Sequence, residues 1–354
     1  MRFPRTFTST APNRRSPSSR RGLLAALLAT CVAALVLAAC GEKSEDDSSA
    51  SDKLSLTLDF YPNPDHAGIY LAQKRGYFRD AGLDLEINSP TDPAAPIKEV
   101  AAGRADLAIS YEPEVLLARD QGLDVVAVAA LVDTPLTSLI WLGDSGIGGI
   151  NDLRGKTIAT AGIPYQDAYL AAILDRVGLT TGDVETVNVG LGLLPALLSG
   201  RVDAMLGGFR NIEGVDLRLR GRNPVVTPVD QLGVPPYDEL VLVAQGERLE
   251  SDSESLRLFI AALERGTAAA VADPAAASQA LAEAAPGVEP NVLSAEIEAT
   301  VPILAGREDR PFGYMDAEKW RAFIAWMRDN GLIESLPEPT EVLSNDLLPG
   351  EIPE

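Results

Sequence analysis

Seven residues that could hold a small molecule stand at or just after the ends of short apolar runs. Their side chains can accept hydrogen bonds, and some can also donate them. In chain order they are Asp59, Asn63, His66, Glu112, Asn211, Glu213 and Asp238. Aromatic rings occupy the same segments, although aromatics make up only 5% of the chain; they are Phe60, Tyr111, Tyr165, Phe209 and Tyr237. Carboxyl and carboxamide groups beside aromatic rings suit a flat heterocycle that presents an amino donor next to a ring-nitrogen acceptor.

Other chemistries have less support. A sulfonate would require arginine or a ring of donors, and Arg210 is the one basic residue in these loops. The chain has no HExxH motif, no Walker loop and no Cys/His cluster, and His66 is its only histidine. The glycine-rich segment 143–150 contains no GxGxxG and reads as a flexible turn. We therefore expect no catalytic residue, no metal and no cofactor.

Each candidate also has a structural interpretation. Asp59 precedes a Pro-x-Pro turn and can satisfy its amides. Tyr111, Phe209 and Tyr237 can be ordinary core aromatics, and His66 can bond a neighbouring carbonyl at a helix start. Glu213, in a loop after small and polar residues, has the strongest claim to ligand contact.

Strands and helices alternate in the segments that must position these side chains. Strands are expected at 54–60, 81–87, 105–110 and 124–131, and helices at 66–78, 93–103 and 112–122, with Asp65 capping the first helix. This alternation predicts βαβ units and a parallel sheet. Ligands bind outside the carboxyl ends of the strands in such sheets. That rule selects Asp59, Phe60, Tyr61, Asn63, Ser110, Tyr111, Glu112, Gly162, Tyr165, Asp167 and residues 207–213, and the return crossing adds Tyr237 and Asp238.

The pattern then restarts. Helix, Gly-Arg-x-Asp and strand recur with Gly103 and Gly200 offset by 97 residues, and a Gly-Leu that ends a helix recurs at Gly82 and Gly178. We expect two lobes of the same βα topology. Segments 137–143 and 237–246 would cross between them as a two-segment hinge, and helices after residue 251 would pack back on the first lobe.

The first 39 residues read as an export signal that ends in Leu-Ala-Ala before Cys40, the expected site of lipidation. The alternative, a transmembrane anchor, fits poorly with the polar run that follows. Residues 19–24 resemble a twin-arginine signal, although paired arginines are also common in other export signals. Removing the six arginines of this segment, which has no acidic residue, takes the formal net charge from −21 to −27 and argues against nucleic-acid partners.

The expected organisation follows from these patterns. It is a signal peptide at 1–39, a tether at 40–53, the first lobe at 54–138, the second lobe at 139–238, the return strand and helices of the first lobe at 239–340, and a tail at 341–354. No second cysteine remains after cleavage, so no disulfide can form within the chain.

Four segments together resemble a known family. The segments "LTLDFYPNPDHAGIYLAQKRGYFRDAGLDLEI", "GRADLAISYEPE", "ALLSGRVDAMLGGFRNIEGVDLRLRG" and "GVPPYDELVLVA" are similar to solute-binding lipoproteins of ABC importers, in the branch that binds pyrimidine precursors of thiamine. The resemblance implies an α/β type II periplasmic-binding-protein fold that closes on hydroxymethylpyrimidine or formylaminopyrimidine. It also implies a permease and an ATPase as partners, and a lipid-anchored monomer on the extracellular or periplasmic side of the cell membrane.

The family's motifs fall on Asp59, Phe60 and Asn63 and on Asn211 and Glu213. Phe60 stands where relatives often have tryptophan, which keeps a stacking face but changes the ring size. Riboflavin, another heterocycle or a sulfonate are alternative ligands. A pyrimidine synthase of the same fold is the alternative of another class, but its cysteine-rich motif has no counterpart here and its histidine lies elsewhere.

Overall fold

The computed structural model describes residues 52–304 and 310–352. The signal peptide, Cys40 and nearly all of the tether expected from the sequence lie outside these ranges. No helix in the described part of the chain is long and apolar enough to cross a membrane.

The first of two sheets has the strand order β2-β1-β3-β10-β4. Its strands are β1 (Asp52–Thr57), β2 (Leu83–Asn88), β3 (Leu107–Ser110), β4 (Val125–Val132) and β10 (Leu240–Gln245). β1 pairs in parallel with β2 and β3, whereas β10 runs antiparallel between β3 and β4. The four strands predicted from the sequence therefore run parallel to one another, while the returning strand β10 enters the centre of the sheet from the opposite direction.

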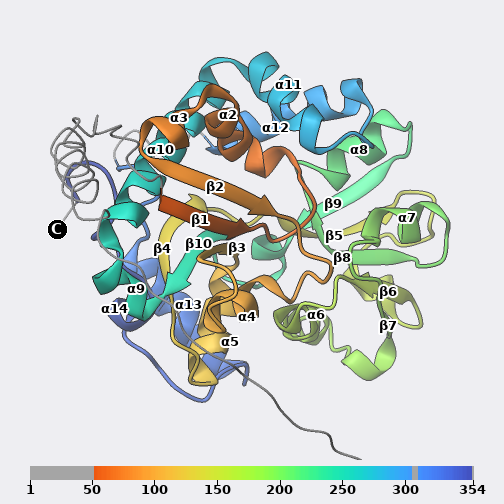
Figure 1. Ribbon diagram of the computed structural model, residues 1–354. Coiled ribbons are helices and arrows are strands. Elements are labelled where there is room, and N and C mark those ends of the chain that lie inside the picture. Colours follow the sequence, from red (N-terminus) through yellow and green to blue (C-terminus); the bar gives the residue numbers. More distant parts are fainter. Residues whose placement is uncertain (1–51, 305–309, 353–354) are drawn as a thin grey trace, which may run out of the picture. The chain divides into compact units, whose positions relative to one another are not determined.

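The second sheet has the order β7-β6-β8-β5-β9. Its strands are β5 (Thr137–Leu142), β6 (Thr157–Thr160), β7 (Glu185–Asn188), β8 (Ala204–Phe209) and β9 (Pro224–Pro228). β5 is antiparallel to both neighbours, and β6 is parallel to β7 and β8. The two sheets therefore share one topology. In each, a strand that comes from the other lobe is inserted antiparallel to its neighbours, β10 in the first sheet and β5 in the second. Figure 1 shows the first sheet in orange to teal and the second in yellow to green.

We call each sheet with its helices a lobe. The helices of the first lobe are η1 (Pro64–His66), α2 (Ala67–Arg75), α3 (Tyr77–Asp80), α4 (Pro96–Ala101), α5 (Glu112–Asp120), α9 (Gly246–Ser251), α10 (Ser253–Ala272), α11 (Pro274–Ala284), α12 (Pro290–Leu304), α13 (Ala317–Asp329) and α14 (Pro339–Val342). Those of the second lobe are η2 (Ile150–Leu153), α6 (Pro164–Asp175), η3 (Thr181–Asp183), α7 (Leu193–Leu198), α8 (Glu213–Leu219) and η4 (Val229–Leu232).

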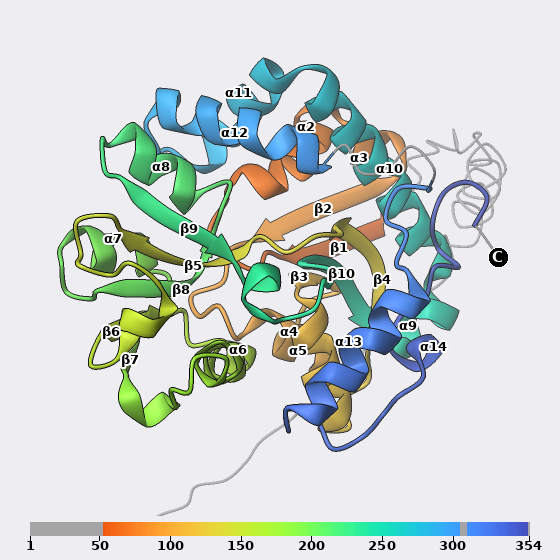
Figure 2. The same ribbon diagram turned by 180° about the vertical axis from the view of Figure 1, so that it is seen from behind.

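The C-terminal helices pack mainly on the first lobe. Glycines allow α10 to touch α2 closely, because a Cβ on Gly266 would lie only 2.2 Å from the carbonyl oxygen of Gly68. Two helices also touch the second lobe. Trp326 of α13 meets Tyr169 of α6 with ring centroids 5.8 Å apart, and α12 contacts α8 as well as η1; Figure 2 shows α12 beside α8. These two helices bring side chains of the first lobe against the second.

The helix that follows the first strand begins differently from the sequence prediction. Asn63, not Asp65, caps η1: its Oδ1 accepts a hydrogen bond from the backbone N–H of Asp65 at 2.9 Å. The Asn63 N–H donates in turn to Nδ1 of His66, which completes a capping box. Asp65 is thereby free to turn its carboxyl group toward the second lobe.

A buried carboxylate ties the two interlobe crossings together. Glu239, just before β10, accepts hydrogen bonds from the N–H groups of Leu136 and Thr137 at 2.6 and 2.8 Å and from the Thr137 hydroxyl at 2.7 Å. Tyr237 donates to the same carboxylate at 2.9 Å. Charge-assisted bonds to one buried side chain hold both chain segments at a fixed separation.

Candidate ligand-binding site

A cavity of about 20 Å³ lies where the strand ends of the two lobes face each other. Its walls are formed by Asp59, Phe60, Tyr61, Asn63 and Tyr111 from the first lobe and by Ala161, Ile163, Tyr165, Gln166, Leu193, Gly207, Phe209, Ile212 and Glu213 from the second. The structure thus brings together seven of the twelve predicted residues, Asp59, Phe60, Asn63, Tyr111, Tyr165, Phe209 and Glu213. We call this space the interlobe cavity.

Polar groups of the first-lobe wall bond one another. Asp59 is buried, and its Oδ2 accepts from the Tyr111 hydroxyl at 2.8 Å. Its Oδ1 lies 2.8 Å from Nε2 of His66. Because Nδ1 of His66 accepts the Asn63 N–H, the ring proton is on Nε2 and is donated to Asp59. His66 lies behind the wall as a support for Asp59 and does not line the cavity.

Glu213 has a different arrangement on the second-lobe wall. As the first residue of α8, it turns back so that Oε2 accepts the N–H of Phe209 at 2.7 Å. No described residue forms a hydrogen bond with its Oε1. Burial raises the pKa of Glu213 to about 7, and the negative charge of Asp216 adds to the rise. A carboxyl group with one bound and one open oxygen is suited to accept a hydrogen bond from a ligand.

Gln166 completes the polar groups of this wall, and the sequence analysis missed it. It is 1% exposed, and its Oε1 accepts the N–H of Ala161 at 2.8 Å. The rule that ligands bind at the carboxyl ends of strands selected its neighbours Tyr165 and Asp167, but Asp167 is exposed. The only signal for Gln166 was its position beside Tyr165 at the start of α6; an uncharged side chain gave no further indication.

Aromatic rings run from the cavity into the core. Tyr111 of the first lobe and Tyr165 of the second have ring centroids 5.6 Å apart, and Tyr169 continues from Tyr165 at 4.9 Å. Phe60 lies 4.5 Å from Tyr61 at the cavity wall. The rings give the cavity flat apolar faces on both sides, the environment that a planar heterocycle requires.

Tyr237 lies beyond the cavity at the far end of this row of rings. It stacks on Phe323 of α13 with centroids 5.1 Å apart and is fully buried. Tyr237 is therefore a core aromatic, as its structural interpretation predicted, and its hydroxyl donates a hydrogen bond to Glu239.

Asn211 joins the lobes instead of lining the cavity. Its Nδ2 donates to Oδ1 of Asp65 at 2.9 Å and to the Thr300 hydroxyl of α12 at 2.8 Å. Both acceptors belong to the first lobe, whereas Asn211 follows β8 of the second. We call this trio the interlobe latch. Burial raises the pKa of Asp65, although the bond from Asn211 opposes the rise.

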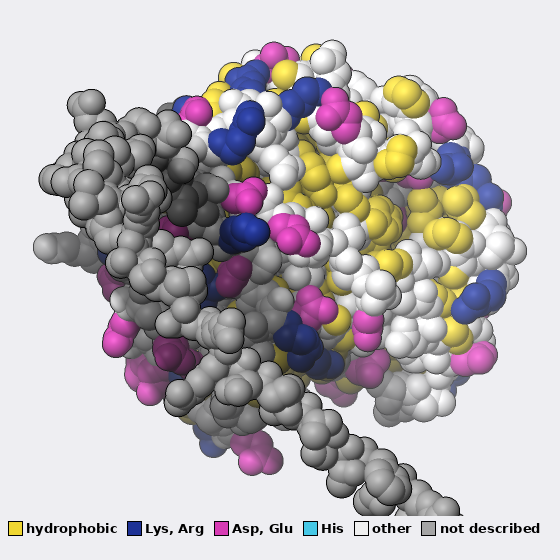
Figure 3. Space-filling model, viewed as in Figure 1, with side chains coloured by type: hydrophobic (Ala, Val, Ile, Leu, Met, Phe, Trp, Pro, Cys, Tyr) yellow, Lys and Arg dark blue, Asp and Glu magenta, His cyan; other side chains and the backbone are white. Residues whose placement is uncertain are grey.

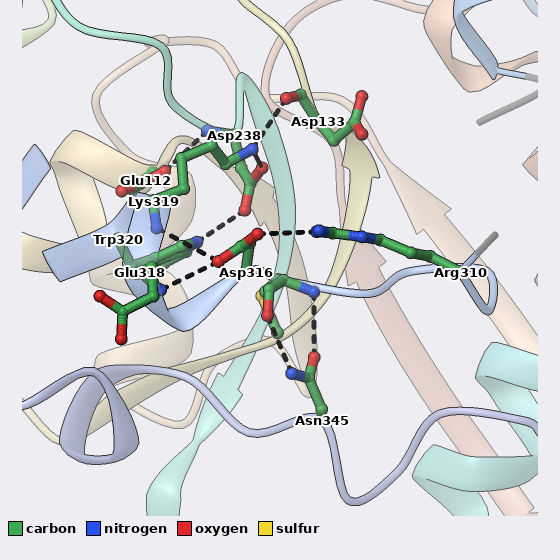
Figure 4. Close-up of polar contacts among 10 residues, drawn as sticks. Glu112, Asp133, Asp238, Arg310, Asp316, Glu318, Lys319, Trp320 and Asn345 are labelled. Atoms are coloured by element: carbon green, nitrogen blue, oxygen red, sulfur yellow. Dashed lines mark hydrogen bonds and ion pairs between the residues drawn. The ribbon is translucent and has the colours of Figure 1, made fainter. Parts of the chain in front are cut away.

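Glu112 and Asp238 belong to a structural network away from the cavity (Figure 4). Asp238 accepts from Nε1 of Trp320 at 2.6 Å and from the Lys319 ammonium, while its own N–H donates to Oε2 of Glu112 at 2.6 Å. Lys319 also donates to the Asp133 carbonyl at 2.8 Å. These contacts fasten α13 to the start of β10. They engage both oxygens of Asp238 and Oε2 of Glu112, whereas Oε1 of Glu112 is buried without a hydrogen-bond partner among the described residues.

A larger hollow, about 400 Å³, lies between α10, β4 and the segment Arg310–Tyr314. Its wall includes Leu131 and Asp133 at the end of β4, and Leu304 and Arg310, between which the chain is not described. We assign no site to it. No group of three or more His, Cys, Asp or Glu residues in the described ranges is arranged to hold a metal ion.

Solved structures with the same architecture define the class of fold. The alkanesulfonate-binding protein SsuA of Xanthomonas axonopodis pv. citri, bound to MOPS, superposes with a TM-score of 0.64 at 17% identity and covers 82% of this chain and 98% of its own. A Candida albicans protein described as having the generic periplasmic binding protein fold has a TM-score of 0.61 at 13% identity, covering 84% of this chain and 98% of its own. The predicted periplasmic-binding-protein fold is confirmed.

Sequence comparisons give the family. Residues 63–277 match the profile described as NMT1/THI5 like. The chain is 38% identical over 291 residues to a Haemophilus influenzae protein named as a thiamine biosynthesis protein, covering 81% of this chain and 90% of the relative. It is 34% identical over 312 residues to the formylaminopyrimidine-binding protein of Halalkalibacterium halodurans, covering 87% and 94%. The chain belongs to the NMT1/THI5-like family, as the resemblance predicted.

The family also contains enzymes. The 4-amino-5-hydroxymethyl-2-methylpyrimidine phosphate synthase of Aspergillus parasiticus is 28% identical over 239 residues, covering 64% of this chain and 69% of the enzyme.

Proposed function

We propose that the protein is the substrate-binding component of an ABC importer and captures a thiamine pyrimidine precursor, hydroxymethylpyrimidine or formylaminopyrimidine, between its two lobes. The observation that carries this proposal is the open oxygen of Glu213 in a cavity walled by aromatic rings of both lobes. A pyrimidine ring would stack against these rings, and its amino group would donate to Glu213. The name of the 34% identical relative supports the same ligand class.

The two lobes would close by rotating about the two crossing segments, 137–143 and 237–246, which Glu239 ties together. In this proposal residues 54–138 and 239–340 form the first lobe and 139–238 the second, with 341–354 as a tail. Ligand bound at the strand ends would bring the lobes together, and the interlobe latch of Asn211, Asp65 and Thr300 would hold the closed form.

The remaining parts of the proposal concern the cell. After removal of residues 1–39, a lipid on Cys40 would hold the monomeric protein at the outer face of the cell membrane through the tether 40–53, where it would deliver ligand to a permease served by an ATPase. We propose no nucleic-acid partner. On the face shown in Figure 3, basic and acidic side chains are interspersed, without a continuous basic stripe.

Two observations disfavour the alternatives. No arginine or lysine is among the residues that line the interlobe cavity, whereas a buried sulfonate would need compensating donors. Both nitrogens of His66 are engaged in structural hydrogen bonds, so its ring is not available as a catalytic acid or base in this geometry. We therefore propose a binding protein and not a synthase.

A thermal-shift series tests the ligand class. The chain from residue 40 onward, with Cys40→Ser, would be melted with thiamine, hydroxymethylpyrimidine, formylaminopyrimidine, riboflavin and taurine. Ligand at 100 times its Kd stabilises a fold by about 2.7 kcal/mol, which gives a clear rise in Tm. We expect a rise with one or both pyrimidines. A rise only with riboflavin or taurine would replace the proposed ligand, and no rise with any compound would contradict a binding role in this class.

A further inference from the structure

Gln166 belongs to the wall of the interlobe cavity and is anchored there through its side-chain oxygen. The backbone N–H of Ala161 can only donate, so the carboxamide atom that meets it at 2.8 Å is the oxygen Oε1. The amide nitrogen Nε2 lies beside Gly207, another residue of the cavity wall. Gln166 lines the cavity and is 1% exposed, and Nε2 forms no hydrogen bond with any described residue.

A glycine bulge makes room for this nitrogen. The pairing of β5 with β8 passes from Ser138–Gly208 directly to Leu139–Leu206, so Gly207 is the extra residue of a β-bulge. Its φ of +112° favours glycine. A Cβ at position 207 would lie 2.3 Å from Nε2 of Gln166. Any side chain here would displace the carboxamide, so backbone conformation and available space both require glycine.

The same local arrangement occurs twice on the second-lobe wall. Gln166 fixes its oxygen on the N–H of Ala161 after β6, and Glu213 fixes Oε2 on the N–H of Phe209 at the end of β8. In each case one terminal atom is held by the backbone and the other is left for the cavity. One of these open atoms is a donor and the other an acceptor.

We infer that Gln166 is a ligand-contacting residue that donates to an acceptor on the ligand while Glu213 accepts from a donor. Together, Gln166 and Glu213 select heterocycles that present both an amino group and a ring-nitrogen acceptor. They disfavour the oxo analogue, in which a carbonyl oxygen replaces the amino donor and a ring N–H replaces the ring-nitrogen acceptor. The inference rests on the proposed function and assigns a specificity determinant within its site. An unpaired amide donor in a closed cavity costs free energy, which a matching ligand atom would remove.

Calorimetric titration with 4-amino-5-hydroxymethyl-2-methylpyrimidine and its 4-oxo analogue tests the inference. Gln166→Glu keeps an oxygen on Ala161 but removes the donor, and Gln166→Met removes the donor at similar length. We expect each to weaken binding of the amino compound by about tenfold or more at pH 8.5, where the new glutamate is ionised, because one hydrogen bond is lost. Gln166→Glu should also shift the preference toward the oxo analogue. Gly207→Ala should give a similar loss by displacing the carboxamide.

Asp167→Asn, at the exposed neighbouring position, is the matched control and should leave Kd unchanged. The Tm of each ligand-free variant reports whether it remains folded. If the wild type binds the amino compound and both folded Gln166 variants bind it within twofold of wild type, the role of Gln166 is overturned while the proposed function stands. If the wild type binds neither compound, the proposed function fails and this inference fails with it.

Discussion

The two walls of the interlobe cavity use their polar groups in opposite ways. On the first-lobe wall, both oxygens of Asp59 are engaged, one by Tyr111 and the other by His66. On the second-lobe wall, Glu213 and Gln166 each keep one polar atom open to the cavity. The Asp59 network of the first wall is internally satisfied, whereas Glu213 and Gln166 of the second wall have unmet hydrogen-bonding capacity.

This difference assigns separate tasks to the lobes. A satisfied network offers a ligand flat apolar faces and a fixed shape, while open donors and acceptors give it an orientation. We therefore expect substitutions on the second wall to change affinity, and substitutions in the first-wall network to change mainly stability.

Glu213→Ala should have the largest effect. Losing a charge-assisted hydrogen bond of about 2–3 kcal/mol would raise the Kd for the pyrimidine by about 30- to 150-fold. Glu213→Gln, which retains an oxygen acceptor, should lose less. Calorimetric titration of both variants measures the difference, and an unchanged Kd for Glu213→Ala would remove the assigned edge contact.

Asp59→Ala should act chiefly on stability. It leaves the buried Nε2–H of His66 and the Tyr111 hydroxyl without their acceptor, so the free energy of unfolding should fall by about 2 kcal/mol. Urea denaturation measures this fall, and Tyr111→Phe in the Asp59→Ala background should add little because the two side chains share one network. A loss of affinity larger than that of Glu213→Ala, with stability unchanged, would reverse the comparison of the walls.

Asn211→Ala should have a moderate effect on closure. Loss of the two hydrogen bonds to Asp65 and Thr300 would destabilise the closed form by about 1 kcal/mol, raising Kd about fivefold. Small-angle scattering with saturating ligand should show a more open average. Lys74→Ala, which removes a surface ion pair to Glu283 away from the cavity, is the control. Unchanged scattering and affinity for Asn211→Ala would mean that the latch contributes nothing.

The smallest effect concerns pH. Burial raises the pKa of Glu213 and of Glu114 to about 7 and that of Glu296, which also lies near the charge of Glu213, to about 8. All exceed the ordinary glutamate value of 4.5. Between about pH 4.5 and 8 the folded protein therefore binds more protons than the unfolded chain, and the free energy of unfolding falls as pH rises.

Melting at pH 5, 6.5 and 8 measures this slope. We expect the highest Tm at pH 5, with Glu296→Gln flattening the decline above pH 7. Acids whose pKa is lowered, such as Asp106 and Asp316, do not affect this window, because they titrate below their ordinary range. A Tm that rises from pH 5 to 8 would show that burial does not raise the pKa of these carboxyl groups.

The alternation of apolar runs and helices determined the fold class and the repeat of one topology. Most expected strands lie within a few residues of β1 to β4, since local periodicity reports which face of an element is buried. The rule that ligands bind at the carboxyl ends of strands located ten of the fourteen residues that line the cavity, because a strand's end can be read from its own sequence. The family resemblance, which relies on residue identities along the chain, was likewise accessible from the sequence and is confirmed.

Only the tertiary structure decided which polar side chains remain open. Asp238 is drawn away from the cavity by Lys319 and Trp320, more than 80 residues later in the chain, and Asn211 is directed to Asp65 and Thr300 on the other lobe. The antiparallel insertion of β10 was equally invisible to a local pattern. Hydrogen-bond partners are fixed by spatial proximity and not by sequence spacing, so the sequence supplied the candidate groups, and the packing of the lobes determined that Glu213 and Gln166 keep an atom free.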